Sequence, residues 1–192
     1  MMHKTLLLST LFFLSISALQ AQRQETLFGN NRLESTGFWY SRTNNFSFYE
    51  EDSEYFSGWN FGFEFNKSFM VGWAWQRLSG LGRIEDTGNP YDLRTNGLLL
   101  AYAPKSHRLL HPYVSMVGGS GKLDYLQRQD RVYVVQPALG FELNVLRWMR
   151  VGGEAGYRLL SGVDVADIDA VDISSPFAQL QFRFGYSSRW NW

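Results

Sequence analysis

Eight stretches of the chain alternate large apolar side chains with small or polar ones, residue by residue. In the clearest stretch, 56–65, one parity holds Trp59, Phe61 and Phe63, and the other holds glycine, asparagine and glutamate. Successive side chains of a β-strand point to opposite faces, so the pattern predicts strands with one apolar and one polar face. Such strands are typical of a barrel with lipid outside and a narrow polar interior.

The predicted strands are about ten residues long, the length that crosses a bilayer as a tilted strand. They span 35–44, 56–65, 69–78, 94–103, 110–119, 131–143, 148–159 and 176–187. Long polar connections at 45–55, 79–93, 120–130 and 160–175 alternate with short turns at 66–68, 104–109 and 145–147. Long outer loops and short periplasmic turns characterise outer-membrane barrels. The sequence therefore predicts an all-β fold, an eight-stranded antiparallel transmembrane β-barrel with up-and-down meander topology and periplasmic termini.

Parity assigns the faces of most predicted strands, but 35–44 and 94–103 are apolar on both faces around Trp39 and Leu99. A soluble barrel would alternate too, with an outer face dense in Lys, Glu and Thr. Here the polar face is mostly Gly, Ala, Asn and Gln, the small residues that fit an eight-stranded lumen. Aromatic residues near the ends of the apolar face resemble membrane-interface girdles. Both features favour the membrane barrel.

The N-terminus has the pattern of a secretory signal. His3 and Lys4 precede an apolar run over 6–19, and Ala21 ends a plausible cleavage site. We therefore predict a signal peptide at 1–21, a polar periplasmic lead at 22–34 and the barrel domain at 35–192. The expected location is the outer membrane of a Gram-negative-type bacterium.

Composition excludes several function classes. The chain has no cysteine, which excludes disulfides, thiol catalysis and cysteine metal sites. Its 18 Lys and Arg balance 18 Asp and Glu, so no global positive field would attract nucleic acid. No cofactor is predicted.

The end of the chain is similar to the final strand of outer-membrane barrels, which the barrel-assembly machinery reads. The aromatic residues that share one parity there are Phe182, Phe184, Tyr186, Trp190 and Trp192. The resemblance implies the assembly machinery as a partner during biogenesis.

A second resemblance covers 130–186. It rests on Val-Val-Gln-Pro at 134–137, Glu-Leu-Asn-Val at 142–145, Gly-Tyr-Arg at 156–158 and Gly-Val-Asp at 162–164. This run resembles small uncharacterised outer-membrane barrels of Bacteroidetes-type bacteria, within the OmpX-like and OmpA-barrel-like group. The first half of the chain matches that group by pattern only. The resemblance implies an eight-stranded outer-membrane barrel and brings no catalytic residues.

Several charged residues have inward parity. They are Glu64, Glu142, Arg150, Glu154, Arg158 and Arg183. A three-residue turn at 145–147 would set Glu142 directly opposite Arg150, with Glu64 and Arg183 at similar depth. We predict that these last four form an ionic network that plugs and rigidifies the lower lumen. The alternative is an ion-pair gate over a narrow pore.

Acidic residues crowd two of the predicted outer loops. They are Glu50, Glu51, Asp52, Glu54, Asp164, Asp167, Asp169 and Asp172. Carboxylates could bind calcium or share divalent cations with lipopolysaccharide phosphates. Their spacing does not match the EF-hand pattern, which favours solvated loops, and no metal site is predicted.

An enzyme is the rival class, because some small outer-membrane barrels modify lipid A. That chemistry needs a histidine near the outer leaflet as general base. His107 and His111 instead fall at the periplasmic turn after 94–103 and are interpreted as part of an ordinary polar turn. We expect no enzymatic activity.

The expected function is a structural or surface-interaction role through the extracellular loops of a plugged barrel. Outer-membrane lipid and lipopolysaccharide are the expected partners, and nucleic acid is not. The alternatives are a narrow channel gated by lumen ion pairs and an accessory subunit of an export or assembly complex.

Overall fold

The computed structural model describes residues 35–48, 53–80, 82–83, 90–126, 128–163 and 173–187. The predicted signal peptide at 1–21 and lead at 22–34 lie outside these residues. Within the described part of the chain, no helix has the length and apolar character needed to cross a membrane.

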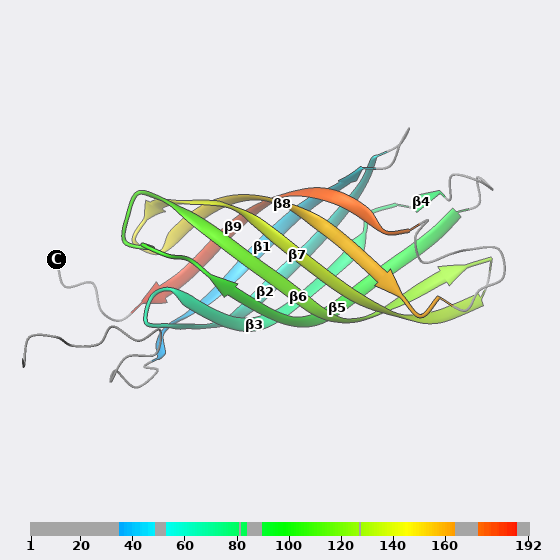
Figure 1. The fold of residues 1–192 in the computed structure, drawn as a ribbon, viewed down its shortest axis with the longest axis horizontal. Coiled ribbons are helices and arrows are strands. Elements are labelled where there is room, and N and C mark those ends of the chain that lie inside the picture. The colour runs from blue at the N-terminus through cyan, green and yellow to red at the C-terminus, as the bar shows by residue number, and fades with distance from the viewer. Residues whose placement is uncertain are drawn as a thin grey trace, which may run out of the picture. The chain divides into compact units, whose positions relative to one another are not determined.

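The described strands form one closed sheet (Figure 1). They are β1 (Ser35–Phe48), β2 (Ser53–Phe65), β3 (Phe69–Leu78), β4 (Gly82–Arg83), β5 (Pro90–Tyr102), β6 (Leu110–Tyr125), β7 (Arg128–Leu146), β8 (Met149–Ser161) and β9 (Ser175–Ser187). Eight of them pair antiparallel in meander order, and the pairings β1–β9 and β3–β5 close the barrel. The two-residue β4 pairs with β5 beside this wall. The predicted eight-stranded antiparallel meander barrel is confirmed.

The strands extend further than predicted at the end away from the short turns. β6 and β7 form a hairpin arm that continues to Leu126, and Asp124 lies opposite Gln129. The prediction of a loop at 120–130 is therefore wrong. Leu123 and Tyr125 explain the difference, because both point inward and are buried, so the alternation continues although the outward residues are charged. In Figure 1 this arm, in light green, reaches the right-hand end.

Exposure decides the facing of the two strands that the sequence left open. Trp39 and Leu99 are each 2% exposed, whereas Phe38 and Leu98 are 50% and 46% exposed. Trp39 and Leu99 therefore point into the barrel. In the other predicted strands, the alternation of buried and exposed positions agrees with the faces assigned by parity.

Two apolar clusters occupy part of the interior, which is less polar than predicted. The mouth cluster, at the end away from the short turns, contains Phe56, Leu78, Tyr91, Leu93, Leu123, Tyr125, Val132, Val134, Leu160 and Ile173. The second cluster, nearer the short turns, contains Trp39, Met70, Ala74, Leu99, Ala101, Ala103 and Tyr113. Polar and charged side chains fill the space around the second cluster and between the two.

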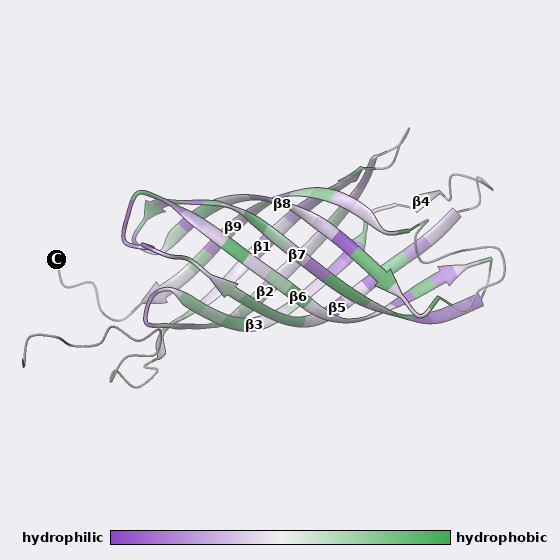
Figure 2. Cartoon of the chain, in the orientation of Figure 1, coloured by the Kyte–Doolittle hydropathy of each residue, from purple (hydrophilic) through white to green (hydrophobic). Residues whose placement is uncertain are grey.

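The outer wall exposes a belt of large apolar side chains. It includes Phe63, Trp73, Leu98, Val135 and Leu139, each between 43% and 68% exposed. Figure 2 shows hydrophobic residues alternating with hydrophilic ones along the middle of the strands. A belt of this extent marks a surface that lipid or another protein covers.

Close backbone approach at one point of the wall gives a test of the packing. A Cβ atom on Gly119 would collide with the backbone oxygen of Asn96, whereas a Cβ on the adjacent Gly118 would meet open space. We expect Gly119→Ala to lower the free energy of unfolding by about 1–3 kcal/mol, the usual cost of overpacking. Gly118→Ala, the matched control, should leave it unchanged or slightly raised. Urea unfolding in detergent micelles measures both, and equal effects would contradict the packing.

Candidate functional site

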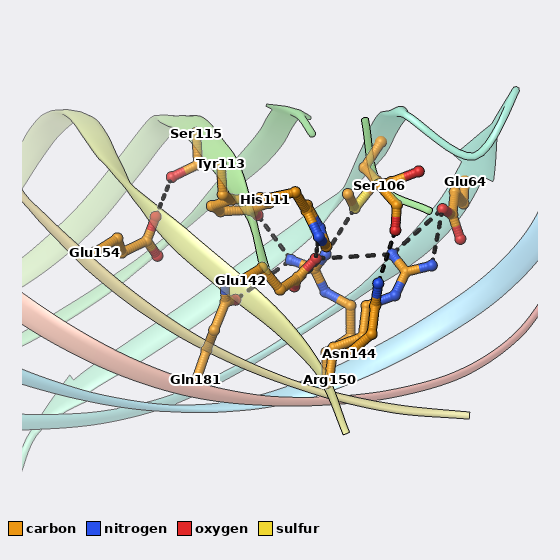
Figure 3. A network of polar contacts seen from close by, with 12 residues as sticks. Glu64, Ser106, His111, Tyr113, Ser115, Glu142, Asn144, Arg150, Glu154 and Gln181 are labelled. Carbon is orange, nitrogen blue, oxygen red and sulfur yellow. Dashed lines mark hydrogen bonds and ion pairs between the residues drawn. The ribbon is translucent and has the colours of Figure 1, made fainter. Parts of the chain in front are cut away.

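The charged cluster in the lumen centres on Glu142 of β7, which is completely buried. Arg183 of β9 approaches it from one side, with 2.8 Å between Nη1 and Glu142 Oε1. Arg150 of β8 lies 3.7 Å from Glu142 Oε2 through Nη1 and 3.2 Å from Glu64 Oε1 through Nη2. Figure 3 shows Arg150 between the two carboxylates. The structure thus brings together the four residues of the predicted ionic network, from β2, β7, β8 and β9.

The register behind this cluster differs from the prediction. Glu142 lies opposite Gly152, and Arg150 lies opposite Asn144. The β7–β8 ladder is irregular between Asn144 and Leu146, and Leu146 pairs with Met149, so the connection is a two-residue turn after a bulge. The predicted three-residue turn, with Glu142 directly opposite Arg150, is wrong. Glu142 and Arg150 still meet, because the long arginine side chain spans the offset.

His111 belongs to the same cluster, which sequence reasoning missed. It lies in β6, is 1% exposed, and its Nε2 is 3.2 Å from Glu142 Oε2. Its Nδ1 is 3.2 Å from the backbone oxygen of Arg108. The interpretation of His111 as part of a polar turn is therefore wrong, although His107 is exposed in that turn. The signal was the parity of Leu110 and Pro112, which places His111 on the inward face.

Arg183 has several further partners in and beside the second apolar cluster. Its Nη2 donates to the Tyr113 hydroxyl at 2.8 Å and to Gln181 Oε1 at 3.4 Å. The guanidinium carbon lies 4.9 Å from the ring centroids of both Trp39 and Tyr113, within cation–π range. These contacts hold a charge in an interior that would otherwise penalise it.

Glu154 and Arg158, the other two predicted lumen charges, stand apart from the ionic cluster. Glu154 accepts a hydrogen bond from the Ser115 hydroxyl at 2.7 Å and another from the Gln179 amide. Arg158 of β8 has a separate set of partners. It donates to Ser47 at 2.9 Å, Asn45 at 3.1 Å and Gln76 at 3.3 Å, and it lies 3.8 Å over the Phe56 ring. A layer of hydroxyls and amides thus separates the ionic cluster from the mouth cluster.

Glu54 is the one residue of the predicted acidic loops that the structure describes. It lies in β2, is 8% exposed, and accepts a hydrogen bond from the Tyr91 hydroxyl at 2.6 Å. Its assignment to a solvated loop is therefore wrong, because the even parity of β2 turns it toward the lumen. Outside the described residues lie Glu50, Glu51, Asp52, Asp164, Asp167, Asp169 and Asp172.

Little free space remains beside these groups. A cavity of about 20 Å³ lies beside Trp39, Glu64 and Arg150, and one of about 10 Å³ lies beside Asn60 and Gln136. Each has at most about the volume that one or two waters need. Among the residues that the structure describes, no group of three or more His, Asp or Glu side chains could hold a metal ion. The arrangement fills the lumen and ties strands together across it.

Comparison with known proteins agrees with this architecture. No protein-family model and no curated protein sequence matches the chain. Among solved structures, Neisserial surface protein A is 8% identical with a TM-score of 0.56, over 82% of this chain and 99% of that one. This likeness shows the fold.

Two further solved structures align with lower TM-scores. Ail, the attachment invasion locus protein of Yersinia pestis, solved with a heparin analogue, is 11% identical with a TM-score of 0.48, over 79% of this chain and 97% of that one. The outer membrane protein OprG from Pseudomonas aeruginosa is 11% identical with a TM-score of 0.44, over 81% and 97%.

The buried carboxylates give a test of the ionic cluster. Glu142→Gln would leave Arg183 and Arg150 without their shared anion, so we expect a loss of about 3–5 kcal/mol in the free energy of unfolding. Glu154→Gln is the matched control, because an amide oxygen can still accept from Ser115. We expect its cost to be about 1 kcal/mol, that of one neutral hydrogen bond. Equal losses in urea unfolding of the two variants would contradict this division.

Proposed function

We propose that the protein is a non-enzymatic barrel of the outer membrane of a Gram-negative-type bacterium. In this proposal it serves as a rigid scaffold that presents its extracellular end to a surface partner. The observation that carries the proposal is the filled lumen, closed at the mouth by an apolar cluster and below it by paired charges. The resemblance to Bacteroidetes-type barrels fits this location.

The outer wall supports the location. In water, its exposed apolar side chains would cause the protein to aggregate, whereas the hydrocarbon of a bilayer would cover them (Figure 2). A closed barrel pairs its strands without leaving a sheet edge in lipid. Short turns at one end and the long β6–β7 arm at the other give the barrel a periplasmic and an extracellular end.

The mouth cluster argues against the channel alternative. An ion-pair gate would open a path by separating Glu142 from its arginines, but that path would still meet the apolar side chains of Leu93, Leu123 and Val132, each 0% exposed. Opening would require the barrel mouth to unpack as well. A scaffold role requires neither change.

The position of His111 supports a non-enzymatic role. Its ring contacts Glu142 and the Arg108 backbone, and it is 1% exposed. A general base must reach the proton that it removes. His111 is enclosed at the short-turn end, away from the outer leaflet where a lipid A substrate would lie.

An accessory role in an export or assembly complex is the second candidate, and native purification from membranes would reveal stable subunits.

Electrical recording tests the filled lumen. We expect the full chain reconstituted in planar bilayers to give no conductance steps, and Glu142→Gln to remain silent as well, because the mouth cluster stays in place. Stepwise openings in the native protein would overturn the scaffold proposal. Openings confined to Glu142→Gln would instead favour the ion-pair gate.

Surface labelling tests the orientation. Leu126 is 58% exposed at the tip of the β6–β7 arm, and Lys105 is exposed in the turn before β6 at the other end. We expect an epitope inserted at Leu126 to bind antibody on intact cells, and an epitope at Lys105 to bind only after permeabilisation. The reverse pattern, or equal labelling, would contradict the orientation.

A further inference from the structure

Four cationic residues form a row across four neighbouring strands of the outer wall. Arg77 of β3 lies opposite Arg94 of β5, Arg94 opposite Lys122 of β6, and Lys122 opposite Arg131 of β7. All four are exposed and have the outward parity of their strands. We call them the cationic row.

The cationic row follows the apolar belt at its extracellular edge. Arg77 is the next outward residue after Trp75, and Arg131 is the outward residue next to Tyr133. Figure 2 shows hydrophilic residues toward the right-hand ends of these strands. In a membrane-spanning barrel this edge faces the headgroups of the outer leaflet.

Like charges directly opposite each other destabilise a sheet, so the row needs anions. Asp92 serves one half of it, 3.4 Å from Arg77 and 2.8 Å from Arg94. The other half differs. Within the described residues, neither the Lys122 ammonium nor the Arg131 guanidinium has an ion pair within 4 Å, and only the backbone nitrogen of Arg131 contacts Asp130, at 2.7 Å.

A hollow lies at this unpaired half. It has a volume of about 340 Å³ and is lined by Asn96, Ser120, Lys122, Gln129, Asp130 and Arg131. Two cations and three neutral hydrogen-bonding side chains can face a phosphate there. The Asp130 carboxylate already accepts from the Arg131 backbone. By register, Asn96 and Ser120 line the hollow on the belt side of Lys122 and Arg131, and Gln129 lines it on the far side.

We infer that Lys122 and Arg131 bind a phosphate of an anionic glycolipid headgroup of the lipid A type, in the outer leaflet beside the barrel. The inference rests on the proposed function, which places this edge at the headgroups. Guanidinium and ammonium groups form charge-assisted hydrogen bonds with phosphate oxygens. Three features fit that ligand: the charge of the two side chains, their lack of an ion-pair partner among the described residues, and the adjoining hollow.

The binding would be one-sided. On β2, β8 and β9 the described outward positions hold no Lys or Arg, and on β1 they hold only Arg42, between Tyr40 and Asn44. Lipid phosphates would therefore gather along β3, β5, β6 and β7. The barrel would carry a bound glycolipid on that wall and leave the opposite wall to neutral or apolar neighbours.

The test titrates lipid A with both phosphates into the full barrel in neutral-lipid nanodiscs. Each cation near an anionic surface changes affinity by about fivefold, so Lys122→Gln/Arg131→Gln should raise Kd by about thirtyfold. The matched control is Lys105→Gln/Arg108→Gln, which removes two exposed cations at the other end and should leave Kd unchanged. Dephosphorylated lipid A should bind the native barrel as weakly as the double variant binds the phosphorylated form.

Three outcomes would overturn the inference. They are an unchanged Kd in Lys122→Gln/Arg131→Gln, an equal loss in the control, and equal binding of dephosphorylated lipid A. Inorganic phosphate that bound as tightly as lipid A would assign the site to a free anion instead of a lipid. The two tests of the proposed function, the absence of conductance and the surface labelling at Leu126, do not depend on Lys122 or Arg131. If lipid A did not bind at these cations, the proposed function would therefore still stand.

Discussion

The structure depends on one buried carboxylate. Glu142 contacts His111 of β6, Arg150 of β8 and Arg183 of β9, and Arg150 extends the cluster to Glu64 of β2. Five of the eight barrel strands, β7 included, are thereby tied across the lumen rather than only along the wall. A buried ion cluster is stable only while all its charges are paired, because removing any one charge leaves its partner buried without a counter-charge. The barrel therefore has a rigid short-turn end, on which the remaining interior is stacked.

The interior above that cluster changes character in steps. Amides and hydroxyls around Glu154 and Arg158 come next, and the mouth cluster closes the end away from the short turns. A continuous water path would have to cross an ionic layer, a hydrogen-bonded layer and an apolar layer, and opening any one of them would leave the other two closed. This sequence of layers suits a protein that keeps its shape while its outer surface acts, and it is a poor design for conduction.

Alternation made the barrel and most of its faces predictable, because parity is a local property that each strand carries in its own residues. Register was not predictable in the same way. The irregularity after Asn144 preserves the inward and outward faces of both strands, yet it makes Gly152, and not Arg150, the residue opposite Glu142. No residue type in the sequence indicates this shift. The β6–β7 arm was missed because charged outward residues resembled a loop, although Leu123 and Tyr125 continued the alternation. The alternation around His111 is enough to predict that its side chain points inward. It cannot do the same for Trp39 and Leu99, because both faces of their strands are apolar, and only their burial in the structure shows that they point inward.

The same arm connects the interior to the outer surface. Leu123 and Tyr125 on β6 and Val132 on β7 pack into the mouth cluster, and the outward neighbours of these residues include Lys122 and Arg131. A slip of one residue in either strand would turn its apolar side chains to the outside and its cations into the lumen. The apolar packing that closes the mouth therefore also fixes the register in which Lys122 lies opposite Arg131. Two repelling cations can be held side by side because burial on the other face of the strands opposes their separation, and this leaves their charge available to an anion from outside.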